Sequence, residues 1–397
     1  MSGERPILIL TASAGAGHTM AARAVAAATT AEAPGERLEV HDVLAWGTAL
    51  FRRLYGGGYA AIIRHAPALM GWLYDRVDCS SRGLGERGRR LVQECFIGPI
   101  ARHLLRRNPK LVINTHYLPA EIIANLRRRG RLDCPQVIVT TDLETHRIWV
   151  QEPAERYYTA TELGGAYLAT WGVPPEHIRT TGIPVRPAFA EVLTPGAARA
   201  RVGLDPERPV VLLLCGALGM GPAEAALRQL VELPPDTQIV AVAGRNERLR
   251  RRLTALAGPA GRRVSVIGFT ERGHEYMRAA DVAVTKPGGL TVSEALVCHL
   301  PLVLLDPIPG QETRNSDYLL EHGAAWKVNN VRLLRYRVNE LLSAPERVVR
   351  MRAATAALAR PCAARDIARD ALGLLGRSEW VGLTNPAAAQ ESAGGPG

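Results

Sequence analysis

Cysteine is scarce in this chain of 397 residues, and long apolar runs are missing. The cysteines form no CxxC pair and have no histidine partner at metal-ligand spacing, which argues against a zinc site and a disulfide framework. The first apolar run, at residues 6–10, is too short for a signal peptide, and no later run is long enough to span a membrane. We therefore expect a reduced, cytoplasmic protein that contacts a membrane only at its surface. The six cysteines are Cys79, Cys95, Cys134, Cys215, Cys298 and Cys362.

Acidic residues are outnumbered, because 38 aspartates and glutamates face 49 lysines and arginines, which gives a net charge of +11 and a pI near 9.7. This balance favours an anionic partner, which could be a nucleic acid, a nucleotide or an anionic lipid surface. The sequence has no zinc-finger or RNP1 signature, so we expect no nucleic-acid partner. The arginine clusters at residues 127–131 and 248–252 are more typical of solvated helix faces than of docking sites.

Short apolar runs alternate with alanine- and arginine-rich helical stretches, a pattern typical of α/β proteins with parallel sheets. The chain is long enough, with 47% hydrophobic residues, to form two domains. The glycine and prolines of Thr181–Pro187 predict a stiff, extended crossing between them. We expect domains at residues 1–186 and 187–365, followed by a helix end and a disordered tail at 366–397. The expected strands are 6–10, 111–114, 136–141, 209–214, 238–243, 263–267, 281–285 and 302–305.

The segment Lys286–Glu294 predicts a phosphate site. A buried strand ends just before it, a glycine turn follows, and the next helix begins with amide N–H groups that are free to bind phosphate. Glu294 follows about one helical turn further along, so a diphosphate and a ribose would fit this layout. Alternatively, the two glycines only let the chain turn between strand and helix.

A second glycine-rich segment, Gly15–His18, follows the first expected strand. His18 should therefore lie near a helix N-terminus at the carboxyl edge of a sheet, where α/β proteins bind ligands. The helix dipole disfavours a protonated imidazole there, so we expect His18 to be a neutral base near pH 7. Alternatively, His18 only caps the helix.

Three more strands are followed by glycine-bearing turns, at Gly216, Gly244 and Gly268. Together with the turn at Lys286, these loops would form a continuous rim at one sheet edge, which turn chemistry alone explains poorly. The sequence therefore predicts a ligand site along this edge.

Taken together, these segments resemble the processive diacylglycerol glucosyltransferases and the monogalactosyldiacylglycerol synthases, which are GT-B enzymes related to the peptidoglycan GlcNAc transferase. The resemblance covers roughly residues 5–365 and keeps one order across both halves. It implies a GT-B fold, in which two Rossmann-like domains face each other across a cleft, the first holding a lipid acceptor and the second a UDP-sugar. Its most specific stretches are Gly15–His18, Ile113–His116, Thr141–Leu143, His146–Val150, Tyr157–Thr161, Thr181–Pro187, Lys286–Gly289, Glu294–Ala295 and Pro307–Glu312 with Asn315.

The resemblance also assigns the UDP-sugar site. It places the diphosphate at Lys286–Gly289 and Thr291, the ribose at Glu294, the uracil at Phe269 and the sugar hydroxyls at Gln311 and Glu312. No cofactor and no metal is implied, because a helix dipole can hold the diphosphate in place of a metal. The implied donor residues are Gly216, Gly244, Asn246, Phe269, Lys286, Pro287, Gly288, Gly289, Thr291, Glu294, Gly310, Gln311 and Glu312.

Transfer in this family inverts the anomeric centre, which requires a base for the acceptor hydroxyl and stabilisation of the leaving UDP. By resemblance His18 is the leading base, with Asp142 as its rival or as the group that orients it. Asp142 could equally be a helix cap or a turn residue. The residues expected on the acceptor and membrane side are Gly17, His116, His146 and Trp149, together with Tyr55 and Trp72 from the segment 46–76.

Between residues 46 and 76, aromatic and aliphatic side chains alternate with four arginines and one aspartate. This mixture suits insertion at an anionic lipid surface, although an ordinary core-facing helix pair fits the pattern equally well. The position of the segment in the expected acceptor domain favours the lipid surface.

We therefore expect an inverting hexosyltransferase that moves glucose or galactose from a UDP-sugar to diacylglycerol at the inner face of the cell membrane. The alternatives are a UDP-GlcNAc transferase that acts on a polyprenyl-linked precursor, a UDP-sugar-binding regulator with little transfer activity, and a nucleic-acid-binding protein. The sequence does not distinguish glucose from galactose.

Overall fold

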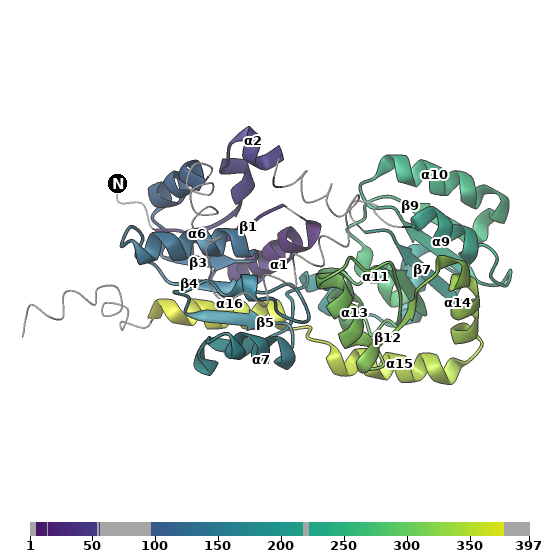
Figure 1. Cartoon of the computed structure of the whole chain (residues 1–397). Helices are drawn as coiled ribbons and strands as arrows, with labels where there is room; N and C mark the ends of the chain where they lie inside the picture. The colour runs from purple at the N-terminus through teal and green to yellow at the C-terminus, as the bar shows by residue number, and fades with distance from the viewer. Residues whose placement is uncertain (1–4, 14, 54, 56–96, 217–221, 377–397) are drawn as a thin grey trace, which may run out of the picture.

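Two parallel six-stranded sheets organise the chain. The computed structural model is drawn in Figure 1. The structure describes residues 5–13, 15–53, 55, 97–216 and 222–376. All eight expected strands are present within two residues of their expected bounds, and four further strands (β2, β5, β6 and β12) join them. The alternation of short apolar runs with helices thus predicted the fold class correctly.

The first sheet has the strand order β2-β1-β3-β4-β5-β6. Its central strands are buried and mostly apolar because helices cover both faces. A further helical stretch covers residues 97–107. The elements of this half are β1 (Ile7–Thr11), α1 (Ala16–Glu32), β2 (Leu38–Asp42), η1 (Val43–Trp46), α2 (Ala49–Arg52), β3 (Leu111–Asn114), α6 (Tyr117–Arg128), β4 (Gln136–Val139), η3 (Arg147–Trp149), β5 (Arg156–Thr159), α7 (Glu162–Thr170), η4 (Pro175–His177) and β6 (Ile178–Thr180).

The second sheet has the strand order β12-β11-β10-β7-β8-β9. Its helices again pack on both faces, and α12 also contacts α1 of the first half. The elements of this half are η5 (Pro187–Ala190), α8 (Pro195–Val202), β7 (Val210–Leu214), α9 (Ala223–Leu230), β8 (Gln238–Val242), α10 (Glu247–Ala257), η6 (Gly258–Arg263), β9 (Val264–Ile267), α11 (Gly273–Ala279), β10 (Val282–Thr285), α12 (Gly289–Val297), β11 (Leu302–Leu305), α13 (Gln311–Glu321), β12 (Ala325–Val328), η7 (Val331–Leu333), α14 (Leu334–Leu342) and α15 (Pro345–Leu358).

Each sheet contains one point at which the strand order reverses. The chain leaves β1 on one side and returns on the other at β3, and it does the same between β7 and β10. The carboxyl ends of strands at such a reversal are where open α/β sheets bind ligands. The loops that follow these four strands are therefore the first place to look for a site.

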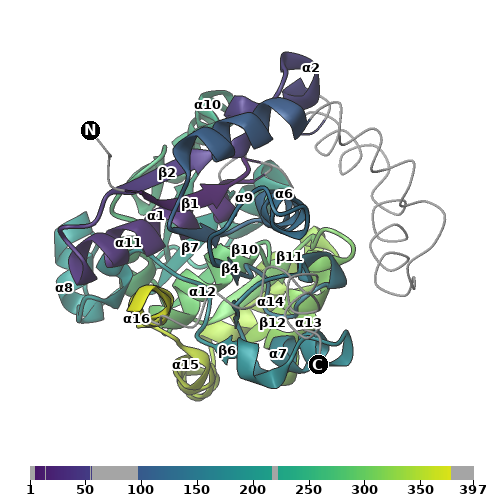
Figure 2. The same cartoon turned by 90° about the vertical axis from the view of Figure 1, so that its left-hand side faces the viewer.

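The last described helices return the chain to the first half. Helix α16 (Ala363–Gly373), followed by η8 (Leu374–Gly376), lies beside α1 (Figure 2). Alanines 364 and 368 pack there against Ala24 and Ala28 of α1. This return was not expected from the sequence. The outward and returning segments touch, because a Cβ on Gly182 (φ +94°) would lie 2.3 Å from the Cβ of Arg360. The two domains are thus joined by two adjacent connections.

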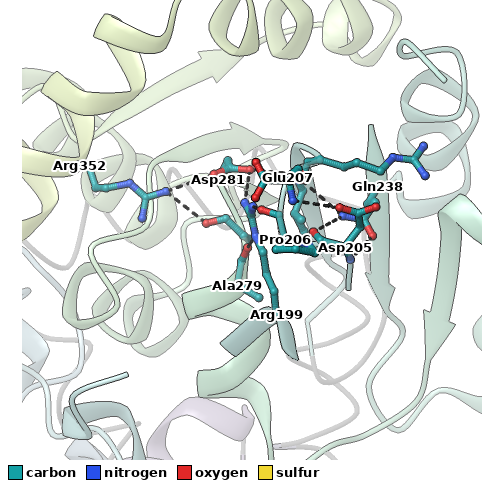
Figure 3. A network of polar contacts seen from close by, with 11 residues as sticks. Arg199, Asp205, Pro206, Glu207, Gln238, Ala279, Asp281 and Arg352 are labelled. Atoms are coloured by element: carbon teal, nitrogen blue, oxygen red, sulfur yellow. Dashed lines mark hydrogen bonds and ion pairs between the residues drawn. The ribbon is translucent and has the colours of Figure 1, made fainter. Parts of the chain in front are cut away.

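A polar network anchors the second sheet at the amino end of its central strands (Figure 3). Oδ2 of Asp281 accepts hydrogen bonds from the backbone N–H of Val210 and from Nη2 of Arg199, each at 2.8 Å. Nη2 of Arg352 lies 3.6 Å from Oδ1 of the same carboxylate. The network fixes β7 and β10 together at the end away from their ligand-binding loops.

Candidate active site

His18 lies in the first turn of α1, and two threonines hold its ring. Its Nδ1 is 3.0 Å from the carbonyl oxygen of Thr115 and 2.9 Å from Oγ1 of Thr141. A carbonyl can only accept, so we assign the proton to Nδ1 and the free lone pair to Nε2. The hydroxyl of Thr115 also donates to the backbone oxygen of His18 at 3.0 Å. His18 is therefore held in the tautomer and orientation that a base requires.

Burial lowers the pKa of His18 to about 4, and the carbonyl of Thr115 opposes this shift only in part. The imidazole is thus neutral near pH 7. The sequence argument invoked the helix dipole for the neutral form, and the structure adds desolvation as a cause.

Aromatic and imidazole rings enclose His18. The ring of His116 meets it edge-on at 4.6 Å between centroids, and Trp149 lies at 6.1 Å. His116 and His146 are both 2% exposed and act as helix caps, because their Nδ1 atoms accept from the backbone N–H groups of Leu118 and Ile148. Both histidines thus stabilise helix starts, and their predicted contact with the lipid acceptor stays a prediction.

Asp142 is buried beside this ring cluster and faces the other domain. Its Oδ1 accepts from the side-chain amide of Gln311, and its Oδ2 accepts from Nε1 of Trp149 at 3.4 Å. Burial raises the pKa of Asp142 to about 6, although these two hydrogen bonds oppose the shift. Asp142 caps none of the described helices, so the structure gives no support to the capping alternative.

The predicted phosphate turn connects β10 with the start of α12. Gly288 is the N-terminal cap residue and no side chain caps the helix, so its first N–H groups remain available. Nζ of Lys286 lies 3.5 Å from Oε2 of Glu312, which also accepts from the backbone N–H of Ile308 at 2.8 Å. A cation and the positive end of a nine-residue helix therefore lie at one turn, as anion binding requires.

Glu294 lies on α12, where burial raises its pKa to about 8 and the nearby charge of Arg186 opposes the shift. Thr291, on the same helix, is partly buried. With this pKa the side chain is mostly a neutral carboxylic acid near pH 7, which can both donate to and accept from hydroxyl groups of a ligand.

The two domains meet closely at these loops. A Cβ on Gly289 would lie 2.0 Å from the carbonyl oxygen of Thr141, so only glycine permits this approach. A Cβ on Gly17 would lie 3.6 Å from the Cβ of Leu290. The start of α1, which carries His18, therefore adjoins the start of α12.

The remaining predicted donor residues line the same sheet edge. Gly216 and Gly244 lie two residues after β7 and β8, and Gly310 directly precedes α13; all three have positive φ. Asn246 caps α10 by accepting from the N–H of Leu249. Phe269 is 49% exposed and stacks under the guanidinium of Arg245 at 4.6 Å.

On the acceptor side, the hydroxyl of Tyr55 donates to that of Tyr117 at 2.7 Å. Trp72, most of the segment 46–76 and the tail 377–397 lie outside the described residues. In the described ranges, no helix combines the length and apolar character that a membrane crossing requires. Within the same ranges, no group of three or more His, Cys, Asp or Glu side chains is arranged to hold a metal ion.

Three residues hold the site together that the sequence analysis named only as parts of the resembling stretches and gave no role: Thr115, Thr141 and Asn315. Asn315 is fully buried on α13, where it accepts from the backbone N–H of Leu143 and donates to the carbonyl of Pro287. Its position four residues after Gln311, on the same helix face, was the available signal.

Comparisons with known proteins agree with this architecture. Residues 18–185 match the family model for monogalactosyldiacylglycerol (MGDG) synthase, and residues 223–357 match the model for glycosyl transferases group 1. The chain is thus similar to the first family in its N-terminal half and to the second in its C-terminal half. A processive diacylglycerol beta-glucosyltransferase of Bacillus subtilis is 34% identical over 244 residues, which cover 62% of this chain and 63% of that protein. The Staphylococcus saprophyticus protein of the same name is 29% identical over 72% of this chain and 74% of its own.

Solved structures show the same fold at low sequence identity. MurG of Acinetobacter baumannii superposes with a TM-score of 0.60 at 15% identity, covering 93% of this chain and all of that one. Anabaena Alr3699/HepE in complex with UDP-glucose superposes with a TM-score of 0.54 at 14% identity, covering 94% of this chain and all of that one. The expected GT-B arrangement of two Rossmann-like domains is therefore confirmed.

Proposed function

We propose that this protein is an inverting glycosyltransferase that moves glucose or galactose from a UDP-sugar to diacylglycerol, giving a β-glycosyl diacylglycerol. The observation that carries the proposal is the contact of Gly17 with Leu290, which brings the candidate base His18 to the candidate diphosphate turn. The names of the relatives supply the chemistry of acceptor and product. The HepE complexes with UDP and UDP-glucose support the class of donor.

In the proposed reaction, Nε2 of His18 takes the proton of the acceptor hydroxyl. The hydroxyl oxygen forms a bond to C1 of the sugar as the bond from C1 to the UDP oxygen breaks on the opposite face. The amides of α12 and the ammonium of Lys286 stabilise the negative charge that develops on UDP. Asp142 lies on the same domain as His18, beside the same ring cluster, and acts either as a second base or as the carboxylate that stabilises the positive charge on the imidazole.

The acceptor is a lipid, so the protein would work at a membrane surface. We expect peripheral association with the anionic inner face of the cell membrane, because the chain carries a net charge of +11. Sedimentation with vesicles of neutral or anionic lipid tests this, and equal binding to both vesicle types would contradict an electrostatic attachment.

The test of function uses the purified chain with vesicles that contain diacylglycerol. UDP-glucose and UDP-galactose are supplied in parallel, UDP release is followed, and the lipid product is identified by mass analysis and its anomer by NMR. A β-hexosyl diacylglycerol is expected with one of the two donors. Transfer only to a polyprenyl-linked acceptor from UDP-GlcNAc, or UDP-sugar binding without turnover, would overturn the proposal.

A further inference from the structure

A single buried amide links the two sides of the candidate site. Asn315, on α13 of the C-terminal domain, is 0% exposed. Its Oδ1 accepts from the backbone N–H of Leu143 at 2.8 Å, and its Nδ2 donates to the carbonyl of Pro287 at 3.0 Å. Leu143 follows Asp142 in the N-terminal domain, and Pro287 belongs to the candidate diphosphate turn.

We propose that Asn315 is a positioning residue that fixes the segment carrying Asp142 against the diphosphate turn and so sets how closely the two domains approach. The linkage requires a side chain that accepts and donates at once. Asparagine does both, whereas aspartate has no donor for the carbonyl of Pro287 and alanine has neither group. Each backbone group is buried, so the loss of its partner leaves an unsatisfied polar atom.

The neighbouring contacts show why this spacing matters. Gly289 allows the carbonyl of Thr141 to approach its Cα closely, and Gln311 reaches Asp142 from the helix turn before Asn315. Residues 141–143 therefore meet the C-terminal domain at three consecutive points. Among the contacts that the structure describes, Gln311 bonds only Asp142, whereas the side chain of Asn315 bonds both Leu143 and Pro287 of the diphosphate turn.

The consequence for catalysis rests on the proposed function, but the contact and its test do not. If Asn315 sets the approach of the domains, its loss separates His18 and Asp142 from the donor and lowers kcat. The arrangement of the domains can be measured without any substrate.

The test is a disulfide across the domain boundary. In the double variant Gly17→Cys/Leu290→Cys, the expected Cβ separation of 3.6 Å lies in the range that disulfides require, so mild oxidation should link the two halves. The rate of linkage, followed by non-reducing peptide mapping, reports how often the domains adopt the described approach. The single variants Gly17→Cys and Leu290→Cys control for disulfides with native cysteines.

Asn315→Ala and Asn315→Asp are then introduced into the double variant. Each is expected to slow linkage about threefold or more, since a hydrogen bond that favours the close approach is lost. Asn330→Ala serves as the matched control, because Asn330 is exposed and only caps η7 through the N–H of Arg332. Its linkage rate should stay unchanged.

Unchanged linkage in a folded Asn315 variant would overturn the proposal. If Asn315→Ala does not fold, the isosteric Asn315→Asp decides, and failure of both to fold would assign the residue to general stability instead. Slower linkage combined with no hexose transfer by the parent protein would leave the positioning role intact and reject the proposed reaction.

Discussion

Gln311 donates its side-chain amide to Oδ1 of Asp142 across the domain boundary. A residue of the predicted sugar-binding loop thus forms a hydrogen bond with the candidate catalytic carboxylate. If Gln311 also holds a sugar hydroxyl, donor binding must share or replace this hydrogen bond. The charge state of Asp142 would then respond to the donor, which makes its pH dependence informative.

The first prediction concerns the acid limb of activity. Burial holds the pKa of Asp142 at about 6, so kcat/KM should fall as the pH drops below 6 and the carboxylate is protonated. Asp142→Asn should lower the plateau about 10²-fold and abolish this limb, because no titrating group remains at the position. Profiles of kcat/KM from pH 4.5 to 8.5 measure both effects. Glu224→Gln, which removes an exposed partner of Arg252, is the control. If Asp142→Asn still loses activity near pH 6, the acid limb belongs to another group and Asp142 is not the titrating residue.

His18→Ala should reduce turnover by about 10²- to 10⁴-fold, the usual contribution of a positioned base. The pKa of His18 is about 4 and that of Asp142 about 6, so His18 is protonated at a lower pH than Asp142. The fall in activity caused by each group can therefore be distinguished in the pH profile. UDP release in the presence of diacylglycerol measures the loss, with His177→Ala on η4 as the control. Retention of more than half of the turnover would exclude His18 as the base.

Glu294 links stability to pH. Its pKa rises from 4.5 in the unfolded chain to about 8, so the native state binds more protons between these values and the free energy of unfolding falls as the pH rises through them. Glutamine at this position does not ionise, so Glu294→Gln does not lose stability as the pH rises. It should be more stable than the parent by roughly several kcal/mol at pH 8.5, because each pH unit between the two pKa values corresponds to about 1.4 kcal/mol, with little difference at pH 4.5. The same variant should bind UDP more weakly if Glu294 holds the ribose.

Thermal unfolding at pH 4.5 and pH 8.5 measures the change in stability of Glu294→Gln, and calorimetric titration with UDP measures the change in affinity. Glu207→Gln, at an exposed loop position, should show neither. Equal stability of Glu294→Gln and the parent at both pH values would show that the carboxylate is well solvated in the folded protein.

Strand burial explains what the sequence could predict of the fold. The buried runs, such as Val210–Leu214, were found because both faces are apolar. Three of the four missed strands, β2, β6 and β12, lie at sheet edges, where partly exposed residues and charges such as those of Leu38–Asp42 break the apolar pattern. The missed β5 contains two tyrosines and an arginine, so it lacks the continuous apolar run by which the other buried strands were predicted.

For the site, glycine turns and helix starts indicated which loops carry ligand-binding groups, because backbone geometry alone places them at one sheet edge. The contacts that join the domains were not predictable in this way. Thr141 and Asn315 act through partners that are 123 and 28 or more residues away, and neither residue type has a local signature for such a contact. The small size of Gly289 was visible in the sequence, but its reason, the carbonyl of Thr141, was not.

Metal removal gives a further prediction. If the amides of α12 and Lys286 hold the diphosphate, hexose transfer should proceed at an unchanged rate after treatment with EDTA. Lys286→Met should instead raise the KM for the UDP-sugar, because the only charge it changes is the one beside Glu312 at the turn. Turnover that disappears with EDTA and returns with Mg²⁺ or Mn²⁺ would contradict this account.

The glycine pair of the turn offers a direct test of domain approach. A Cβ at position 289 would come within 2.0 Å of the carbonyl of Thr141, whereas one at Gly288 would meet only Oε1 of Glu312 at 3.7 Å, an ordinary contact. Gly289→Ala must therefore push the domains apart by about 1 Å, a displacement that can cost about 10²-fold in rate. Gly288→Ala, at φ −68°, is compatible with alanine and should lose far less. The comparison of kcat in the two variants, with thermal unfolding as a check that both fold, isolates the effect of domain spacing. Equal losses in both variants would mean that the turn, and not the approach of Thr141, limits the reaction.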